Sequence, residues 1–136
     1  MRVFVDTNVF LYAAGRAHPK RDACARVLRK VAEGSLDATV NSEVLQEILY
    51  VLSRRGRRED GVALARNVAA LFPELLSVTR EDMDMAFELA LRHPLLPVRD
   101  AVHAGTMLRG GLKRVISVDE DFDQIPEIER VDPADV

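Results

Sequence analysis

The sequence predicts an α/β domain built on a mostly parallel sheet that is flanked by helices on both faces. Short apolar runs alternate with longer amphipathic stretches along the chain, and this alternation is typical of parallel strands joined by crossover helices. Glycine and proline punctuate the stretches where helices would end. The chain has 136 residues, 48% of them hydrophobic, which is enough for a substantial core. We therefore expect residues 1–136 to form a single domain.

Five short apolar runs are expected to form the strands of this sheet. Most are rich in β-branched and large apolar residues, which are favoured in strands, and polar residues, glycine or proline bound them. The expected strands span residues 2–6, 36–40, 75–78, 115–118 and 129–131, the last as an edge strand. We expect residues 132–136 to be a short tail.

Helices are expected between these runs because apolar residues recur there at helical spacing and stop signals follow. In the second helix, Ala23 and Val27 share one face, and Gly34 follows the last turn. Ser42 is expected to cap the third helix, and residues 79–82 have a capping-box pattern. The expected helices span residues 7–14, 19–33, 42–54, 58–72, 79–92 and 98–108.

Composition argues against a membrane protein and against a secreted one. No apolar run reaches the roughly 18 residues that a transmembrane helix needs, so we expect no membrane partner. Asp6, Thr7 and Asn8 interrupt the N-terminal region before an apolar signal segment could form. Cys24 is the only cysteine, which excludes an intrachain disulfide and favours packing in a helix. These features predict a cytoplasmic protein.

Acidic residues stand where several of the expected elements end or begin. Asp6 and Asp119 follow strands, Glu47 lies within a helix, and Asp100 opens a helix. Sites in parallel sheets form beyond the carboxyl ends of strands, so we expect these acids to share one pocket and to be catalytic. Clustered carboxylates repel one another unless a cation lies among them. Oxygen ligands favour Mg²⁺ or Mn²⁺, with Asp6, Asp100 and Asp119 as the expected metal ligands.

Each of these acids also has a structural interpretation, as the end of a strand or as a first-turn acid that complements a helix dipole. Glu43 lies one helical turn before Glu47 on the same face and competes with it for the site. Asp121 and Asp123 compete with Asp119, although we expect both in a solvated turn. We favour Glu47 and Asp119 as the site residues.

Three polar residues are expected to support the acids from a second layer. Asn8 is placed to anchor Asp6 or a metal-bound water, and Ser117 is placed to hydrogen-bond a carboxylate or a substrate phosphate. His103 lies three residues after Asp100 and therefore near the same helix face. A packed or surface histidine is the alternative interpretation of His103.

The distribution of positive charge matters more than the net charge of −3, which alone argues weakly against bulk nucleic-acid binding. One segment is crowded with basic residues: Arg54, Arg55, Arg57 and Arg58. Arginine binds phosphates bidentately, so this cluster is predicted to bind nucleic acid. The alternative is a solvated helix end whose cations complement the dipole. The aromatic residues, Tyr50 among them, are too scattered in the sequence to predict a stacking platform for bases.

Taken in order, the four acidic segments resemble the motifs of PIN-domain nucleases, and within them the VapC-type toxins of toxin–antitoxin modules. The motifs lie at residues 3–8, 41–47, 99–104 and 116–122, and the resemblance covers nearly the whole chain. The resemblance implies a Mg²⁺- or Mn²⁺-dependent endoribonuclease. It also implies a homodimer and a small antitoxin protein that neutralises it.

The chemistry of the acids supports this interpretation, because metal ions held by carboxylates can activate water and cover charge in phosphodiester hydrolysis. A signalling receiver domain is the rival from another class, but it needs a lysine after a late strand, and Lys113 precedes its strand. A PIN-like RNA-processing nuclease without an antitoxin is a closer rival. A catalytically silent PIN-like binding module is the last, and the complete set of acids argues against it.

Overall fold

A computed structural model describes residues 1–136 of the chain. The strands are β1 (Val3–Val5), β2 (Ala38–Thr39), β3 (Arg114–Ile116) and β4 (Glu129–Val131). The helices are α1 (Thr7–Ala14), α2 (Arg21–Glu33), α3 (Ser42–Arg54), α4 (Arg58–Leu71), α5 (Arg80–Arg92) and α6 (Val98–Arg109). Two short 3₁₀ helices follow, η1 (Glu120–Gln124) and η2 (Pro133–Asp135). The predicted alternation of strands and helices is confirmed.

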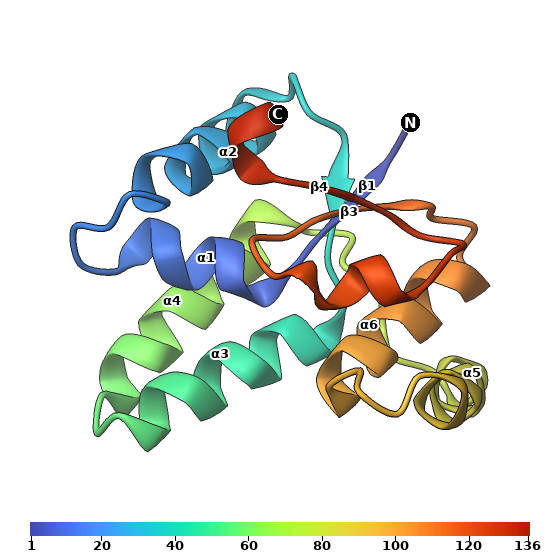
Figure 1. Cartoon of the computed structure of the whole chain (residues 1–136). Coiled ribbons are helices and arrows are strands. Elements are labelled where there is room, and N and C mark those ends of the chain that lie inside the picture. Colours follow the sequence, from blue (N-terminus) through green and yellow to red (C-terminus); the bar gives the residue numbers. More distant parts are fainter.

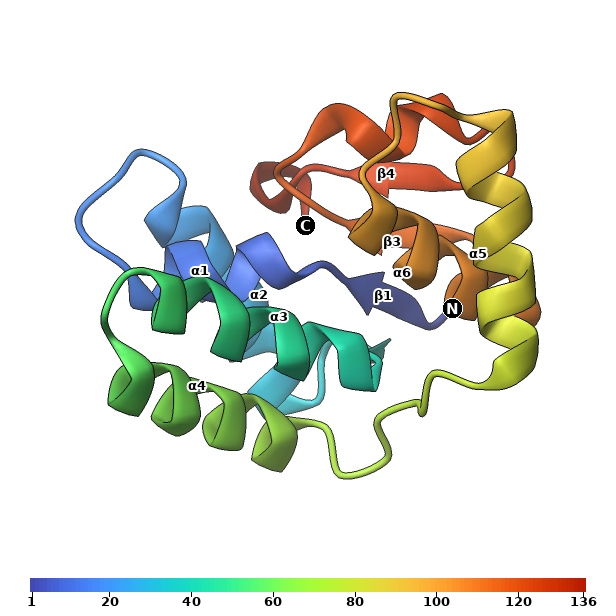
Figure 2. The same ribbon diagram turned by 90° about the horizontal axis from the view of Figure 1, so that it is seen from below.

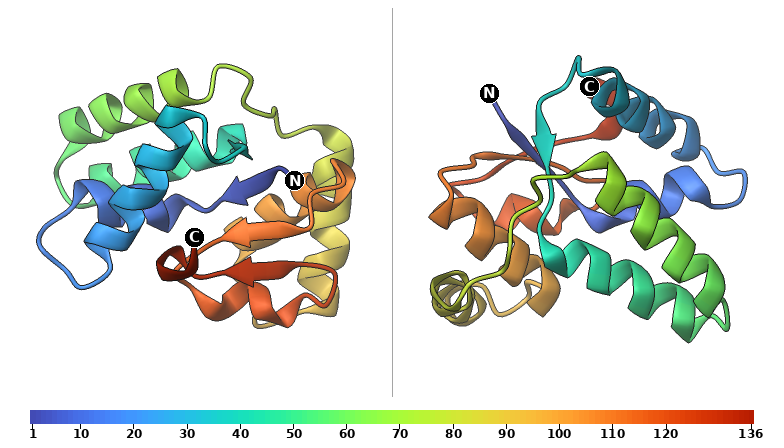
Figure 3. Two further views of the ribbon diagram at one scale, coloured as in Figure 1. Left: turned by 90° about the horizontal axis from the view of Figure 1, so that it is seen from above. Right: turned by 180° about the vertical axis from the view of Figure 1, so that it is seen from behind.

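The four strands form one parallel sheet in the order β2-β1-β3-β4. From β1 the chain moves to one neighbour, β2, and then crosses back to β3 on the other side of β1. Because such crossovers are right-handed, the connections before and after β2 lie on opposite faces of the sheet. Figure 1 shows α2 above the strands and α3, α5 and α6 below them. The topological switch point therefore lies between β1 and β3, which are side by side in Figure 3.

The helices below the sheet form two packed pairs, α3 with α4 and α5 with α6, which Figure 2 shows at opposite ends of the molecule. Gly105 lets α5 and α6 approach closely, because a Cβ at this position would lie 2.5 Å from the backbone oxygen of Asp82. Phe4, Phe10 and Ile48 are fully buried between the sheet and the helices. None of the helices combines the length and the apolar character that a membrane span requires.

The strand predicted at residues 75–78 is wrong. Only Leu76 pairs, through a single bridge: its N–H donates to the Val40 oxygen at 2.9 Å, and its oxygen accepts from the Ser42 N–H at 2.9 Å. The N–H of Val78 turns away from any ladder and donates to the Ser42 hydroxyl at 3.2 Å. This apolar run therefore covers the end of β2 but forms no strand.

Two local predictions also need correction. Asn41, not Ser42, caps α3: its Oδ1 accepts from the Val44 N–H at 3.1 Å, while its Nδ2 donates to Thr106 on α6 at 2.9 Å. Asn41 is fully buried and so ties α3 to α6. The C-terminal residues are not a free tail, because η2 packs against α2 with Pro133 buried.

Candidate active site

The carboxyl ends of β1 and β3 bring together residues that are more than one hundred positions apart in the sequence. Asp6 follows β1, and its backbone N–H still donates to the Ile116 oxygen of β3 at 3.0 Å. Ser117 and Asp119 follow β3 directly. These side chains therefore lie at the switch point of the sheet, where parallel α/β proteins place their sites.

Asp6 is almost fully buried, with 4% of its surface exposed. One carboxylate oxygen caps α1 by accepting from the Thr7 N–H at 2.8 Å, and the other accepts from the Ser117 hydroxyl at 2.7 Å. The Nε2 atom of His103 lies 3.9 Å from the first oxygen. Asp6 is thus held by the start of α1, by the segment after β3 and by α6.

The aspartates converge into a space of metal-ion size. Single ligand atoms of Asp6, Asp100 and His103 lie within 4.8 Å of one another, and so do those of Asp100, Asp119 and Asp121. Asp100 comes from the first turn of α6 and belongs to both groups. The structure therefore brings together three of the predicted acids, Asp6, Asp100 and Asp119.

Burial dominates the electrostatics of Asp6 and Asp100. It raises the pKa of Asp100 to about 8, with a further contribution from the negative charge of Asp6. The pKa of Asp6 is also raised, chiefly by burial, although His103 and the Ser117 hydrogen bond oppose the shift. Carboxylates with raised pKa values resist being ionised at the same time, and a divalent cation between them would remove this conflict. A set of carboxylate oxygens suits a hard cation.

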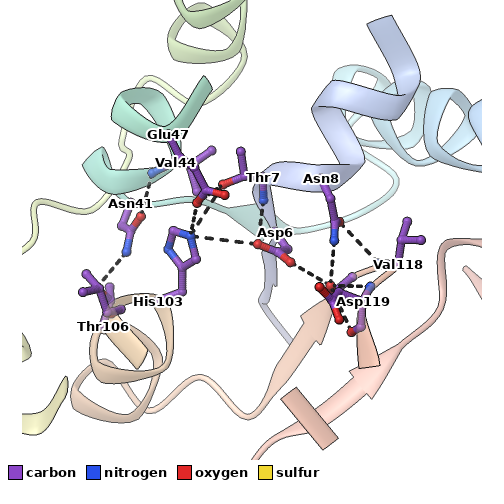
Figure 4. Close-up of polar contacts among 12 residues, drawn as sticks. Asp6, Thr7, Asn8, Asn41, Val44, Glu47, His103, Thr106, Val118 and Asp119 are labelled. Atoms are coloured by element: carbon purple, nitrogen blue, oxygen red, sulfur yellow. Dashed lines mark hydrogen bonds and ion pairs between the residues drawn. The ribbon is translucent and has the colours of Figure 1, made fainter. Parts of the chain in front are cut away.

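Glu47 lies beside this cluster and is held by a different set of partners. Its Oε1 accepts from the Thr7 hydroxyl at 3.0 Å and from Nε2 of His103 at 3.1 Å, as Figure 4 shows. Burial alone would raise the pKa of Glu47, but the hydrogen bond and the charge of His103 outweigh burial, and the pKa is lowered. Burial also opposes protonation of His103, yet the bond to Glu47 and the nearby acids raise its pKa. Glu47 is therefore kept as a carboxylate.

Glu43 is placed differently from Glu47, although both lie on α3. It accepts no side-chain hydrogen bond, and burial raises its pKa despite the charge of His103. His103 itself is fully buried against Phe4, with ring centroids 5.4 Å apart. The prediction that His103 lies near the acids is therefore confirmed in position, and the surface alternative is wrong.

Asn8 and Ser117 lie at the site, but Asn8 forms no hydrogen bond with Asp6. Its Nδ2 donates to the Ser117 hydroxyl at 3.3 Å, and its Oδ1 accepts from the Val118 N–H at 3.3 Å. The same hydroxyl accepts from the Asp119 N–H at 3.1 Å and donates to Asp6. Asn8 and Ser117 therefore fix the loop that carries Asp119, and Figure 4 shows Asn8 facing this loop.

Asp121 lies in the turn η1, as expected, but it is only partly exposed and lies close to the other acids. Its N–H donates to Oδ1 of Asp119 at 3.1 Å, and burial together with Asp119 raises its pKa. It thus belongs to the acidic cluster. Asp123 does lie on the surface, where it pairs with Arg130 at 3.1 Å. Sequence reasoning weighed Asp121 only as a rival of Asp119, whereas the 3₁₀ turn η1 brings both toward Asp100.

The predicted arginine cluster lies at the far end of α3. Arg54 is seven residues beyond Glu47, which corresponds to about 10 Å along the helix, and the turn between α3 and α4 projects away from the sheet in Figure 1. Arg57 pairs with Asp60 at 2.9 Å. The arginine beside the acids is Arg99, which neighbours Asp100 and acts electrostatically on Glu43. Sequence reasoning missed both Arg99 and Thr7 as site residues.

Fold and site together define a parallel α/β protein with a partly buried carboxylate cluster at its switch point, and comparison with known proteins identifies its family. The family model described as "PIN domain" matches residues 3–128. The chain therefore belongs to the PIN-domain family, which confirms the resemblance and excludes the receiver domain.

Curated relatives match over nearly their full length. VapC ribonuclease Mb1869c of Mycobacterium bovis is 31% identical over 129 residues, which cover 95% of this chain and 98% of the relative. Ribonuclease VapC23 of Mycobacterium tuberculosis is 34% identical over 120 residues, which cover 86% and 92%.

Solved structures confirm the fold. VapBC2 from Rickettsia felis, bound to a DNA fragment from its promoter, superposes with a TM-score of 0.76 at 18% identity and covers 97% of this chain and 98% of its own. VapC20 of Mycobacterium tuberculosis, described as a sarcin–ricin loop cleaving toxin, gives a TM-score of 0.74 at 21% identity, with coverage of 91% and 95%.

Proposed function

We propose that this chain is a metal-dependent endoribonuclease and the toxin of a toxin–antitoxin pair. One observation carries the proposal: buried Asp6 and Asp100 meet the exposed Asp119 at the switch point of a PIN domain whose curated relatives are named VapC ribonucleases. The substrate is RNA, and a small antitoxin protein is the regulatory partner. We propose a cytoplasmic location because both partners would be met there.

Asp6, Asp100 and Asp119 would hold the ion, and Asp121 is near enough to Asp100 to contribute. Mg²⁺ or Mn²⁺ is proposed because every donor of this set is a carboxylate oxygen. When bound, the ion would polarise the scissile phosphate and lower the pKa of a bound water. Ser117 and Asn8 would keep Asp6 and the Asp119 loop in place as charge builds up at the phosphate.

Glu47 is proposed to orient the attacking water. Both of its hydrogen bonds, from Thr7 and His103, end on Oε1. Oε2 is therefore the oxygen left to accept a proton from water. The lowered pKa of Glu47 keeps it ionised and able to accept. Thr7 and His103 act as positioning residues, because they fix which oxygen of Glu47 faces the pocket.

The proposed function is tested by incubating the purified chain with structured RNA in Mg²⁺, in Mn²⁺ and in EDTA. Cleavage with either ion, its loss in EDTA and its inhibition by the antitoxin encoded beside the gene are expected. Equal cleavage in EDTA would contradict a metal-dependent nuclease. An active enzyme with no neighbouring antitoxin would instead favour an RNA-processing nuclease.

Replacing Glu47 by Gln is expected to lower kcat about 100-fold, because the variant keeps the shape but loses the charged proton acceptor. Glu43→Gln is the matched control on the same helix face, and a change of less than about threefold is expected, since Glu43 has no hydrogen-bond partner in the site. Steady-state cleavage of one RNA by both variants measures the difference. An equal or larger loss in Glu43→Gln would transfer the role to Glu43.

A homodimer is also proposed. The large exposed apolar side chains gather on α5, on the loop after it and at the start of α6: Phe87, Leu91, Leu95 and Val98. Exposed apolar side chains grouped on neighbouring elements are typical of a protein interface. This face is therefore the proposed surface for self-association.

A further inference from the structure

Three side chains form a stack at the border of the acidic site. The Cζ atom of Arg99, from the first turn of α6, lies 4.4 Å from the ring centroid of Tyr50 on α3. The Cζ atom of Arg54, one helical turn further along α3, lies 5.8 Å from the same centroid, and its Nη1 donates to the Tyr50 hydroxyl at 3.5 Å. Tyr50 is 41% exposed, so this arginine–tyrosine stack is open to solvent.

Arg99 breaks a local rule, and its neighbours are the ring of Tyr50 and the negative charges of Glu43 and Glu47. A cation in the first turn of a helix opposes the helix dipole, yet Arg99 forms no ion pair and no hydrogen bond. The other cations near the acids are engaged: Arg130 pairs with Asp123 and Asp132, and His103 is buried against Glu47. A residue that breaks a local rule in this way is often a functional one.

The stack leaves its charged groups ready to bind. Stacking on an aromatic ring holds a guanidinium plane in place, while its N–H groups stay free to donate to a phosphate in a fork. Glu47, Tyr50 and Arg54 lie at intervals of three and four residues on α3, so they share one face of the helix. The stack therefore leads from the proposed catalytic carboxylate outward along α3.

We propose that the arginine–tyrosine stack binds backbone phosphates of the RNA strand next to the bond that is cleaved. The inference rests on the proposed function, because it describes how the RNA substrate of that site is bound. The acidic cluster repels a polyanion even with one divalent ion bound, and Arg99 is the free cation beside it. Of the arginine cluster, only Arg54 belongs to the stack. Tyr50 is too isolated in the sequence to predict a stacking platform for bases. In this proposal it acts by ordering both arginines.

The test compares Arg99→Gln with Arg109→Gln, which removes an exposed arginine from the other end of α6. Binding of a labelled single-stranded RNA oligonucleotide is measured by anisotropy in EDTA at several salt concentrations, and cleavage is measured in Mn²⁺. Arg99→Gln is expected to weaken binding about tenfold and to reduce the salt slope by about one. KM should rise while kcat changes less than about threefold. This is the pattern expected when a contact that binds the ground state and the transition state equally is lost.

Tyr50 supplies an independent pair of variants. Tyr50→Phe keeps the ring and should bind RNA with nearly the affinity of the wild-type chain. Tyr50→Leu should lower the RNA affinity about threefold or more, because the guanidinium planes are no longer ordered. Size-exclusion chromatography of each variant gives the oligomeric state. Mn²⁺ titration checks that metal affinity is unchanged.

The outcomes separate this inference from the proposed function. If the wild-type chain neither binds nor cleaves RNA, both are overturned. If it cleaves RNA and Arg99→Gln matches Arg109→Gln in binding, KM and salt slope, only the stack is overturned. A changed oligomeric state with unchanged RNA affinity would also overturn it and would assign these residues to a protein interface.

Discussion

Asp6→Asn is expected to reduce RNA cleavage about 1,000-fold or more. The substitution removes one negative charge from the centre of the proposed metal site, and the loss of a charged metal ligand removes several kcal/mol of transition-state stabilisation. The fold should survive, because an Asn side chain keeps an oxygen that can accept from the Thr7 N–H at the cap of α1. Single-turnover cleavage at a fixed Mn²⁺ concentration measures the effect.

Asp84→Asn is the matched control, because it neutralises an exposed aspartate on α5 that is remote from the cluster. It should cleave RNA as fast as the wild-type chain. Raising the Mn²⁺ concentration should recover part of the Asp6→Asn activity if the defect is in ion binding. Full activity of Asp6→Asn at low metal would refute the assignment of Asp6 as a ligand.

The sequence predicted the elements better than it predicted their arrangement. The strands at residues 3–5 and 114–116 could be read from apolar runs that end at a polar residue, and their following acids pointed to a site. The run at residues 75–78 has the same local character, yet it forms one bridge only. Strand propensity measures how well a residue fits a pleated, half-buried surface. The sequence does not show whether a neighbouring strand has a free edge with which the run could pair.

The site shows the same limit. Asp6 and Asp100 could be predicted because each stands at the end of an element, whereas the contact of Thr7 with Glu47 spans forty positions and depends on how α3 packs on α1. Tyr50 looks isolated in the sequence for a similar reason. Its stacking partner Arg99 lies 49 residues later, and only the packing of α3 against α6 brings them together.

In the metal-free protein, Asp100→Asn is expected to raise stability at pH 8 and to flatten its dependence on pH. The pKa of Asp100 is about 8 in the folded chain, against roughly 3.9 for an unfolded aspartate. Between these values the folded chain binds a proton that the unfolded chain has released. Stability must therefore fall as pH rises from about 4 to about 8. Asn carries no charge in either state, so this loss disappears.

The gain outweighs the favourable dipole interaction that the variant gives up. A carboxylate in the first turn of a helix contributes about 0.3–1 kcal/mol, whereas burying it beside Asp6 raises its pKa by several units, each unit corresponding to about 1.4 kcal/mol. With allowance for relaxation around the site, we expect a net gain of about 1–2 kcal/mol, or roughly 4–8 °C in Tm. Thermal unfolding in EDTA at pH 5, 6.5 and 8 measures it.

Metal should reverse this order, which makes the experiment decisive. A divalent ion stabilises whichever chain binds it more tightly, so the wild-type chain should gain more in Mn²⁺ than Asp100→Asn and should become the more stable of the two. Asp84→Asn should follow the wild-type curves in both conditions. If Asp100→Asn is the less stable chain in EDTA at pH 8, Asp100 supports the start of α6 and is not held in place for an ion.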